Sequence, residues 1–467
     1  MPTMIESPLS RLSAEQIEEL GKEVETIHDE VFGDLGDRDR RYITSMIEMH
    51  RRLVVLGRVI LFASRYKPAW IAGTSMLSLA KILENMEIGH NVMHGQWDWM
   101  NDPQISSTAW DWDSASTAEA WKHSRNYVHH TFTNILGKDR DLGYKIMRID
   151  PHQKWHPVYL FQPFYNLALA AFFEWGVATH DLDVEAIKAG DKSKEQILRA
   201  LKGMAGKGRQ QIVKDYIAFP ALSGLANLAV EAVLASGRID GARTAFGGRA
   251  KVKRALRRAR SNADPRRSSG APQQVLRELI RRRAFREPFR TTLRADFTAN
   301  IVRNVWAYGI IFCGHFPDQT YTFTQEETED ESRGAFYVRQ LLGSANIEGS
   351  PLFHVVSGNL GYQVEHHLYP DMPSTRYAEI APRVKDICQR YDLPYNTGPF
   401  LSQLGQVQRT ILRLALPGGK PRPKPGPYRG DDTEPAVQNG RHHAKTGANG
   451  SGPEQGTDGV RVSMPDD

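Results

Sequence analysis

The chain has 467 residues, a formal net charge of +6 and only two cysteines, Cys313 and Cys388. Two cysteines are too few for a disulfide framework or a thiolate metal site, so any metal must be held by other ligands. The mean hydropathy of -0.48 is typical of a soluble protein, but polar ends dilute several apolar stretches in the middle. The chain does not open with a basic segment and an apolar run, so no cleaved signal peptide is expected.

Residues 1–50 are polar and amphipathic, and we expect them to form a cytoplasmic helical segment. Ser13 and Gln16 have the spacing of a capping box, which predicts a helix beginning next to Ser13. This segment carries no candidate for chemistry.

Five apolar segments follow, and Pro68 between the first two predicts a helical hairpin. Each segment is short or carries charged residues, whereas a bilayer span needs about 20 mostly apolar residues. One alternative is that they are buried helices of a large soluble protein. Their interleaving with histidine clusters favours membrane spans instead. The segments are 53–64, 68–86, 158–178, 216–236 and 295–314.

The histidine clusters lie at the ends of these apolar segments. In "GHNVMHGQWDW" the first two histidines are four residues apart, which places both rings on one face of a helix. The adjacent pairs in "NYVHH" and "YQVEHH" are about 100° apart around a helix, so one pair can serve two metals. Packing could explain any one cluster, but their joint occurrence indicates a metal centre. The residues are His90, His94, His129, His130, His315, His366 and His367.

Imidazole ligands suit zinc, copper, iron or nickel without choosing sharply among them. Zinc would be satisfied with four ligands, so seven histidines imply two metals. At a membrane face, two irons suggest oxygen activation on an apolar substrate, because a methylene C–H offers no acidity for acid–base catalysis.

These motifs resemble the three histidine boxes of the membrane fatty acid desaturase family. The matching stretches are "HNVMH", "NYVHH" with "TFTNILGKDRDLGY", and "QVEHHLYPDMPSTRY". "GHNVMHGQWDWMNDP" and "NVWAYGIIFCGHFPD" look particularly like bacterial acyl-CoA desaturases. The resemblance covers about residues 40–400 outside a basic stretch. It implies an all-α integral membrane bundle of about four crossings, with a cytoplasmic histidine-rich cap that holds two irons.

By this resemblance the seven histidines above match iron ligands. Gln363 opens the third box as it does in one branch of the family, and Tyr362 stands where close bacterial relatives have histidine. The second box departs from the family, which has a histidine three or four residues before the doublet. Those positions here are Asn126 and Arg125.

His123 is the nearest substitute for the missing ligand, one turn before Asn126. In an α-helix it would be shifted by about 4.5 Å along the axis. That shift is large against metal–nitrogen bonds of about 2.0–2.1 Å, so we do not expect His123 to replace the ligand. A carbonyl oxygen of Asn126, or water, could fill the place. Arg125 cannot ligate, and we expect it to reach solvent or pair with Asp139 or Asp141.

The stretch from Arg238 to Arg290 is strongly basic, with seventeen lysines and arginines but four acids. The positive-inside tendency predicts that it is cytoplasmic. Segments 158–178 and 216–236 would then cross the membrane, while 295–314 lies along the interface and delivers His315. Nucleic-acid binding is not expected, because no aromatic residues interleave the charges. Anionic lipid headgroups, the phosphates of acyl-CoA or an acidic redox protein are the candidate contacts.

Residues 51–400 form the predicted membrane domain, with the basic stretch as an insertion, and 401–467 a C-terminal segment. The tail after Pro417 is rich in proline and glycine and should be disordered, so His442 and His443 within it are incidental.

The resemblance implies an acyl-CoA desaturase of the cytoplasmic membrane, with its termini and histidine boxes on the cytoplasmic side. It would use O2 to introduce a cis double bond into a long acyl chain, carried by CoA or a lipid. No "HPGG" segment like that of cytochrome b5 and no nucleotide-binding glycine motif occurs, so a separate ferredoxin or NADPH-dependent oxidoreductase would supply electrons. A fatty acid hydroxylase, or a silent protein that lacks the box-two ligand, remains the alternative.

Overall fold

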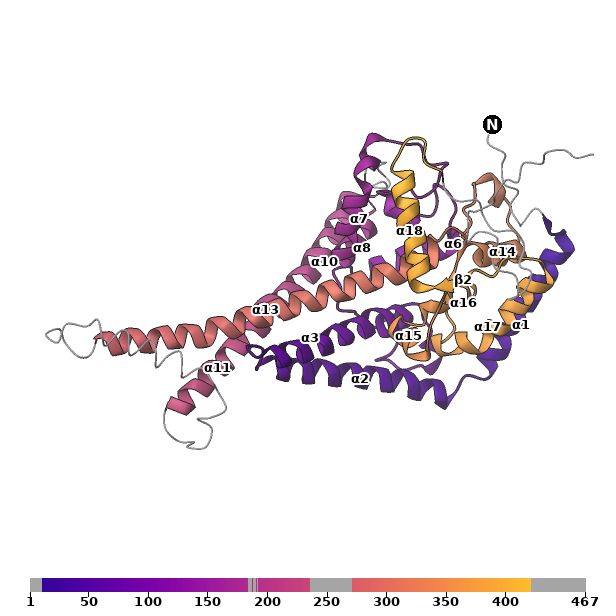
Figure 1. Ribbon diagram of the computed structural model, residues 1–467. Helices are drawn as coiled ribbons and strands as arrows, with labels where there is room; N and C mark the ends of the chain where they lie inside the picture. The colour runs from indigo at the N-terminus through magenta and orange to yellow at the C-terminus, as the bar shows by residue number, and fades with distance from the viewer. Residues whose placement is uncertain (1–10, 184–186, 188–189, 191, 236–270, 421–467) are drawn as a thin grey trace, which may run out of the picture.

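The computed structural model describes residues 11–183, 187, 190, 192–235 and 271–420, and this part of the chain is mostly helical (Figure 1). The predicted disorder after residue 417 falls almost wholly outside the described residues, as does most of the basic stretch. The longer helices are α1 (Ala14–Gly33), α2 (Asp37–Leu61), α3 (Lys67–Ile82), α7 (Gln162–Ala171), α8 (Phe173–Asp181), α10 (Lys194–Ile212), α11 (Phe219–Ala235), α13 (Ala271–His315), α14 (Arg333–Gly343), α17 (Tyr377–Arg390) and α18 (Phe400–Leu414).

Short elements complete the described chain. Three segments are π-helical: Leu83–His90, His123–His129 and Val213–Ala218. Short α-helices are α4 (Asn91–Met93), α5 (Ala118–Lys122), α6 (His130–Phe132), α15 (Pro351–Val356) and α16 (Gln363–Leu368). Strands β1 (Asn346–Glu348) and β2 (Thr397–Pro399) pair in parallel, with Ile347 opposite Gly398. Single 3₁₀ turns are Asp98–Met100, Leu142–Lys145, Pro157–Phe161, Glu326–Thr328, Leu360–Tyr362 and Ser374–Arg376.

A compact cap is built from α1, α14, α16 and α17 (Figure 1). The predicted capping box of α1 is confirmed, because Ser13 Oγ accepts from Gln16 N while Gln16 Oε1 accepts from Ser13 N. The helix buries one apolar face, with Leu20 and Val24 in the same core as residues of α14 and α17. The N-terminal segment thus belongs to the cap by packing.

Helices α2, α3, α11 and α13 extend away from this cap as a bundle (Figure 1). The predicted α2–α3 hairpin is confirmed, with Pro68 in the first turn of α3, where its missing N–H costs nothing. Charged side chains are buried inside the bundle, where Arg58 forms ion pairs with Asp215 at 2.9 Å and with Asp296. Large apolar side chains face outward, including Val55, Val59, Leu225, Val302 and Val305. The bundle therefore buries charged side chains beside a small apolar cluster and exposes large apolar side chains on its outer surface.

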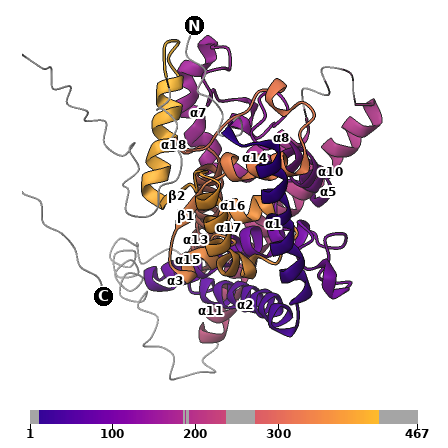
Figure 2. The ribbon, with the colours of Figure 1, turned by 90° about the vertical axis from the view of Figure 1, so that its right-hand side faces the viewer.

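The course of two apolar segments bears on the expected crossing by 158–178 and the expected interfacial position of 295–314. Residues 158–178 do not form one helix, because the chain breaks at Phe172 (φ -118°, ψ 35°) between α7 and α8. Figure 2 shows α7 beside α18 on a flank of the cap, where Asn166 of α7 donates to Gln408 of α18. Residues 295–314, expected to lie along the membrane interface, continue α13, which packs along α3 and α11.

Length and composition allow one helix of the described residues, Lys194–Val233, to cross a membrane. Helix α13 has 45 residues and so extends about 68 Å. Arg290, in the described part of the basic stretch, lies about 38 Å along this helix from His315. That separation exceeds a hydrocarbon core of about 30 Å, although the sequence predicted both to lie on one side of a membrane.

Candidate metal centre

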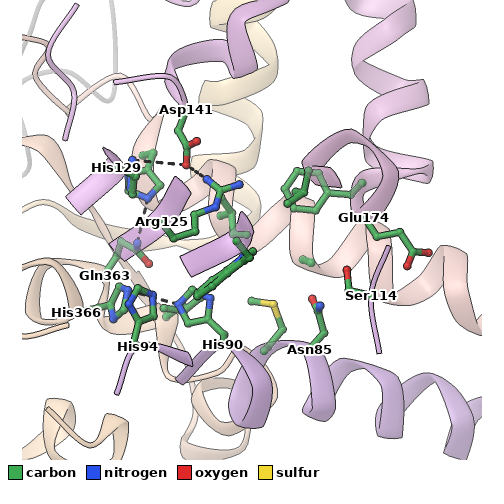
Figure 3. A pocket seen from close by; sticks show the side chains of 18 of the residues that line it. Asn85, His90, His94, Ser114, Arg125, His129, Asp141, Glu174, Gln363 and His366 are labelled. Carbon is green, nitrogen blue, oxygen red and sulfur yellow. Dashed lines mark hydrogen bonds and ion pairs between the residues drawn. The ribbon is translucent and has the colours of Figure 1, made fainter. Parts of the chain in front are cut away.

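Seven histidines from four chain segments line one cavity, and Figure 3 labels four of them, His90, His94, His129 and His366. Two of the segments are π-helical, a geometry often found at functional sites, and end at His90 and His129. His315 is the last residue of α13, and His366 and His367 lie on α16. The boxes come from distant parts of the sequence, so only the tertiary fold makes them neighbours.

Six of the histidines form two groups of three. Within each group, the ring nitrogens that could bind a metal lie within 4.8 Å of one another. His130 belongs to neither group but lies between them, with its ring centroid 4.9 Å from that of His94 and 4.6 Å from that of His367. The 366–367 doublet is divided between the groups. The groups are His90 with His94 and His366, and His129 with His315 and His367.

The donor set fits a transition metal. Ring nitrogens of four buried histidines have no hydrogen-bond partner among the described residues: His94 Nε2, His130 Nδ1, His315 Nδ1 and His367 Nε2. Such orphaned atoms are rare in protein interiors and need an explanation. Burial also lowers the pKa of His366 and His367 well below the usual range, so these imidazoles are neutral and keep a free lone pair. Neutral imidazoles suit iron, copper, zinc or nickel.

Outer residues hold the rings of the centre in place. Nδ1 of His129, His366 and His367 lies 3.2, 3.2 and 3.0 Å from Asp139 Oδ1, Tyr377 OH and Gln340 Oε1. Such partners fix the tautomer of a ligating histidine. Sequence reasoning missed Gln340 and Tyr377 in this role. Tyr377 closes the quoted third-box stretch, but Gln340 lies on α14 with no motif to mark it.

The positions His123, Arg125 and Asn126 of the second box differ in their exposure. His123 and Asn126 are exposed, and the Asn126 amide donates to the Met93 carbonyl at 2.9 Å. The α-helical spacing that we assumed does not apply, because His123–His129 is π-helical. Arg125 is buried and pairs with Asp141, so the expected ion pair is confirmed and the solvent-facing orientation is wrong.

Two further polar contacts surround the centre. Asp141 also approaches His129 Nδ1 at 3.5 Å and accepts from His180 Nε2 at 3.1 Å. Gln363, which opens the third box, is buried with its Nε2 3.1 Å from His315 Nε2, and its Oε1 has no partner among the described residues.

A cavity of about 50 Å³ lies between the histidines and an apolar wall that includes Met86, Trp112, Phe173 and Ala307. Figure 3 shows the histidines at one end, and Asn85, Ser114 and Glu174 at the other. The cavity therefore brings apolar side chains up to the metal-binding groups, as a site for an apolar substrate requires.

Fold and site together define a helical protein with a buried, all-imidazole candidate metal centre facing an apolar cavity. Residues 249–399 match the family model described as fatty acid desaturase. The chain is 41% identical over 408 residues to the NADPH-dependent stearoyl-CoA 9-desaturase of Mycobacterium tuberculosis (strain CDC 1551 / Oshkosh), covering 87% of this chain and 82% of the relative. The chain belongs to the fatty acid desaturase family and is an oxidoreductase.

More distant relatives agree. The sn-1 linoleoyl-lipid 6-desaturase of Synechocystis sp. (strain ATCC 27184 / PCC 6803 / Kazusa) is 23% identical over 350 residues, covering 73% of this chain and 79% of the relative. Human fatty acid desaturase 3 is 32% identical over 113 residues, or 24% of each chain. No solved structure matches the chain.

Proposed function

We propose that this chain is an acyl-CoA desaturase that introduces a cis double bond into a long acyl chain at two irons held by its seven clustered histidines. The observation that carries this proposal is the pair of three-histidine groups beside an apolar cavity. The Mycobacterium relative, named as a stearoyl-CoA 9-desaturase, supports acyl-CoA as the substrate class.

We assign one iron to the group of His90, His94 and His366, and the other to the group of His129, His315 and His367. His130 lies between the groups and is available to either iron. Gln363 offers its unpartnered Oε1 near His315, whereas the exposed His123 and Asn126 are left out of the set.

Iron, when bound, supplies the oxygen-dependent oxidation of the chain. The reaction balances as –CH2–CH2– plus O2, two electrons and two protons, giving –CH=CH– and two waters. The protein holds the two reacting methylene groups of the acyl chain against the histidines and keeps bulk water out of the cavity. Trp112, Phe173 and Ile311 line the cavity for this purpose. The electrons come from a separate donor, and the NADPH dependence in the name of the Mycobacterium relative supports NADPH as their source.

We infer four membrane crossings, by α2, α3, α11 and α13, with the histidines at the cytoplasmic end. The α2–α3 hairpin turns at the end far from the cap, and α11 ends and α13 begins at that same end (Figure 1). The outward apolar side chains on these helices support contact with lipid. In this arrangement 295–314 crosses the membrane in place of 158–178, and Arg290 lies at the opposite face. Protease accessibility of tags placed before α1 and beside Arg290 tests this assignment, which fails if both tags are cleaved from the same side.

The function is tested by expressing the full chain and analysing both iron and acyl chains. Wild type should hold about two irons and yield unsaturated products, identified by mass spectrometry as the loss of two hydrogens. His367→Ala should lose iron and product, whereas the matched control His123→Ala, in the exposed position, should keep both. A gained oxygen atom would indicate a hydroxylase. One iron or none in wild type, with no product, would indicate a silent protein.

A further inference from the structure

The cavity beside the histidines is too small for a long acyl chain. Its volume is about 50 Å³, whereas sites for small molecules usually occupy about 300–1,000 Å³. The reacting methylenes fit there, but the rest of the chain needs another path. Two directions lead away from the histidines along the bundle.

The first direction ends at buried charged side chains. Glu174 lines the far end of the cavity with Asn85 and Ser114 (Figure 3), and behind it Glu174 pairs with Arg303 and accepts from Gln211 at 2.7 Å. This ion pair is itself buried and hydrogen-bonded, so it fills this end of the site with charged side chains and offers a methyl end no apolar wall. An acyl chain is therefore turned away from this end.

The second direction leads to an open groove of about 430 Å³ between α3 and α13. The groove begins close to the cavity on the same two helices. Ile82 lies four residues before Met86, and Val302 five residues before Ala307, or about 6 and 7.5 Å along the axes. Its lining is mostly apolar with four hydroxyl groups: Trp70, Ile71, Thr74, Ser75, Ser78, Leu79, Ile82, Thr298 and Val302.

Acyl-chain length agrees with this path. Ile82 lies eight residues before His90, at most about 12 Å along the helix. An extended chain with bonds of about 1.5 Å advances about 1.3 Å per carbon, so about nine carbons beyond the reacting position reach Ile82. Carbons further along the chain would enter the groove.

We propose that the methyl end of the acyl chain leaves the histidine cavity between Ile82 and Val302 and lies in the groove between α3 and α13. This inference rests on the proposed desaturase function. The Glu174–Arg303 pair closes one end of the site, while the groove leaves the other end open to the membrane lipid. The site therefore has no blind end, and chains well beyond eighteen carbons are substrates.

Two valine substitutions on α13 form a matched test. Val302 and Val305 are both exposed, at 41% and 48%, but only Val302 lines the groove. Val302→Trp should lower desaturation of behenoyl-CoA about tenfold relative to palmitoyl-CoA, equivalent to about 1.4 kcal/mol. Val305→Trp should leave that ratio unchanged. Equal ratios in the two variants, or a wild type that rejects behenoyl-CoA, would overturn the proposal.

Photo-crosslinking tests the path without relying on turnover. A behenoyl-CoA analogue with a diazirine near its methyl end should label groove residues of the full-length wild type. The label should be lost in Val302→Trp and kept in Val305→Trp. Labelling that is unchanged in Val302→Trp would refute the path even if the enzyme is active. Labelling of the groove without any product from wild type would uphold the path while refuting the desaturase assignment.

Discussion

The buried pair of Arg125 and Asp141 gives the sharpest prediction about the altered second box. The family resemblance places a histidine here, yet the arginine is only 7% exposed and Asp141 only 4%. Asp141→Asn keeps the size of the side chain but removes the carboxylate that pairs directly with the buried guanidinium, leaving Asp139 and Asp181 as the nearby acids. Removing one partner of a buried pair costs about 3–5 kcal/mol, which at roughly 2–4 °C per kcal/mol lowers the melting temperature by about 6–20 °C.

Combining Asp141→Asn with Arg125→Leu removes the unpaired charge. Replacing both members of a buried pair is often nearly neutral, so the double variant should melt above Asp141→Asn alone. The assay is thermal unfolding in detergent, followed by intrinsic fluorescence and calorimetry, with iron content measured in parallel. Asp111→Asn is the control, because the Asp111 side chain is largely exposed, at 62%, and its pair with Lys207 should be worth less than about 1 kcal/mol.

Two outcomes would refute this reasoning. One is an Asp141→Asn variant that melts no lower than Asp111→Asn. The other is a double variant whose drop in melting temperature equals the sum of the drops in Asp141→Asn and Arg125→Leu, because coupled charges should not behave additively.

Three further expectations follow from the same site. Asn126→His should leave iron content unchanged, because position 126 is exposed; a gain in iron would show that the position faces the metals. Tyr377→Phe should weaken iron retention about 10–100-fold in a chelator titration by removing the partner of His366 Nδ1, and unchanged retention would deny it a positioning role. Burial raises the pKa of Glu365 to about 7, so in metal-free protein the folded state binds its proton more tightly and loses stability as pH rises from about 4.5 to 7. Glu365→Gln should remove this pH dependence, which amounts to about 3 kcal/mol of unfolding free energy between pH 4.5 and pH 7. An unfolding free energy that varies with pH as it does in wild type would contradict this expectation.

Several features could be predicted from local sequence because their causes are local. Ser13 and Gln16 lie within hydrogen-bonding reach of each other in the first turn of α1, so their spacing alone predicted the helix start. The histidine clusters were recognisable by residue type and spacing, and the desaturase family followed from them. The prediction that an adjacent pair can face two sites agrees with His366 and His367, which fall into different groups.

The second box shows where local geometry failed. We placed His123 by α-helical periodicity, but the π-helical turn and the packing of Arg125 on Asp141 leave it exposed. A stretch of six residues does not encode that choice, because the partner carboxylate comes from a separate loop. Gln340 escaped notice for the same reason, since its contact with His367 joins α14 to α16.

By itself the sequence indicated which histidines are the candidate metal ligands and which family the chain belongs to, since both depend on residue types at short spacings. Only the tertiary structure decided how the apolar segments are used. Segments 158–178 and 295–314 have similar composition, yet one breaks at Phe172 and the other continues a 45-residue helix. Hydropathy sums side chains along the chain, whereas the course of a helix depends on what packs against it. The same packing divides the histidines into two groups and leaves open the groove between α3 and α13.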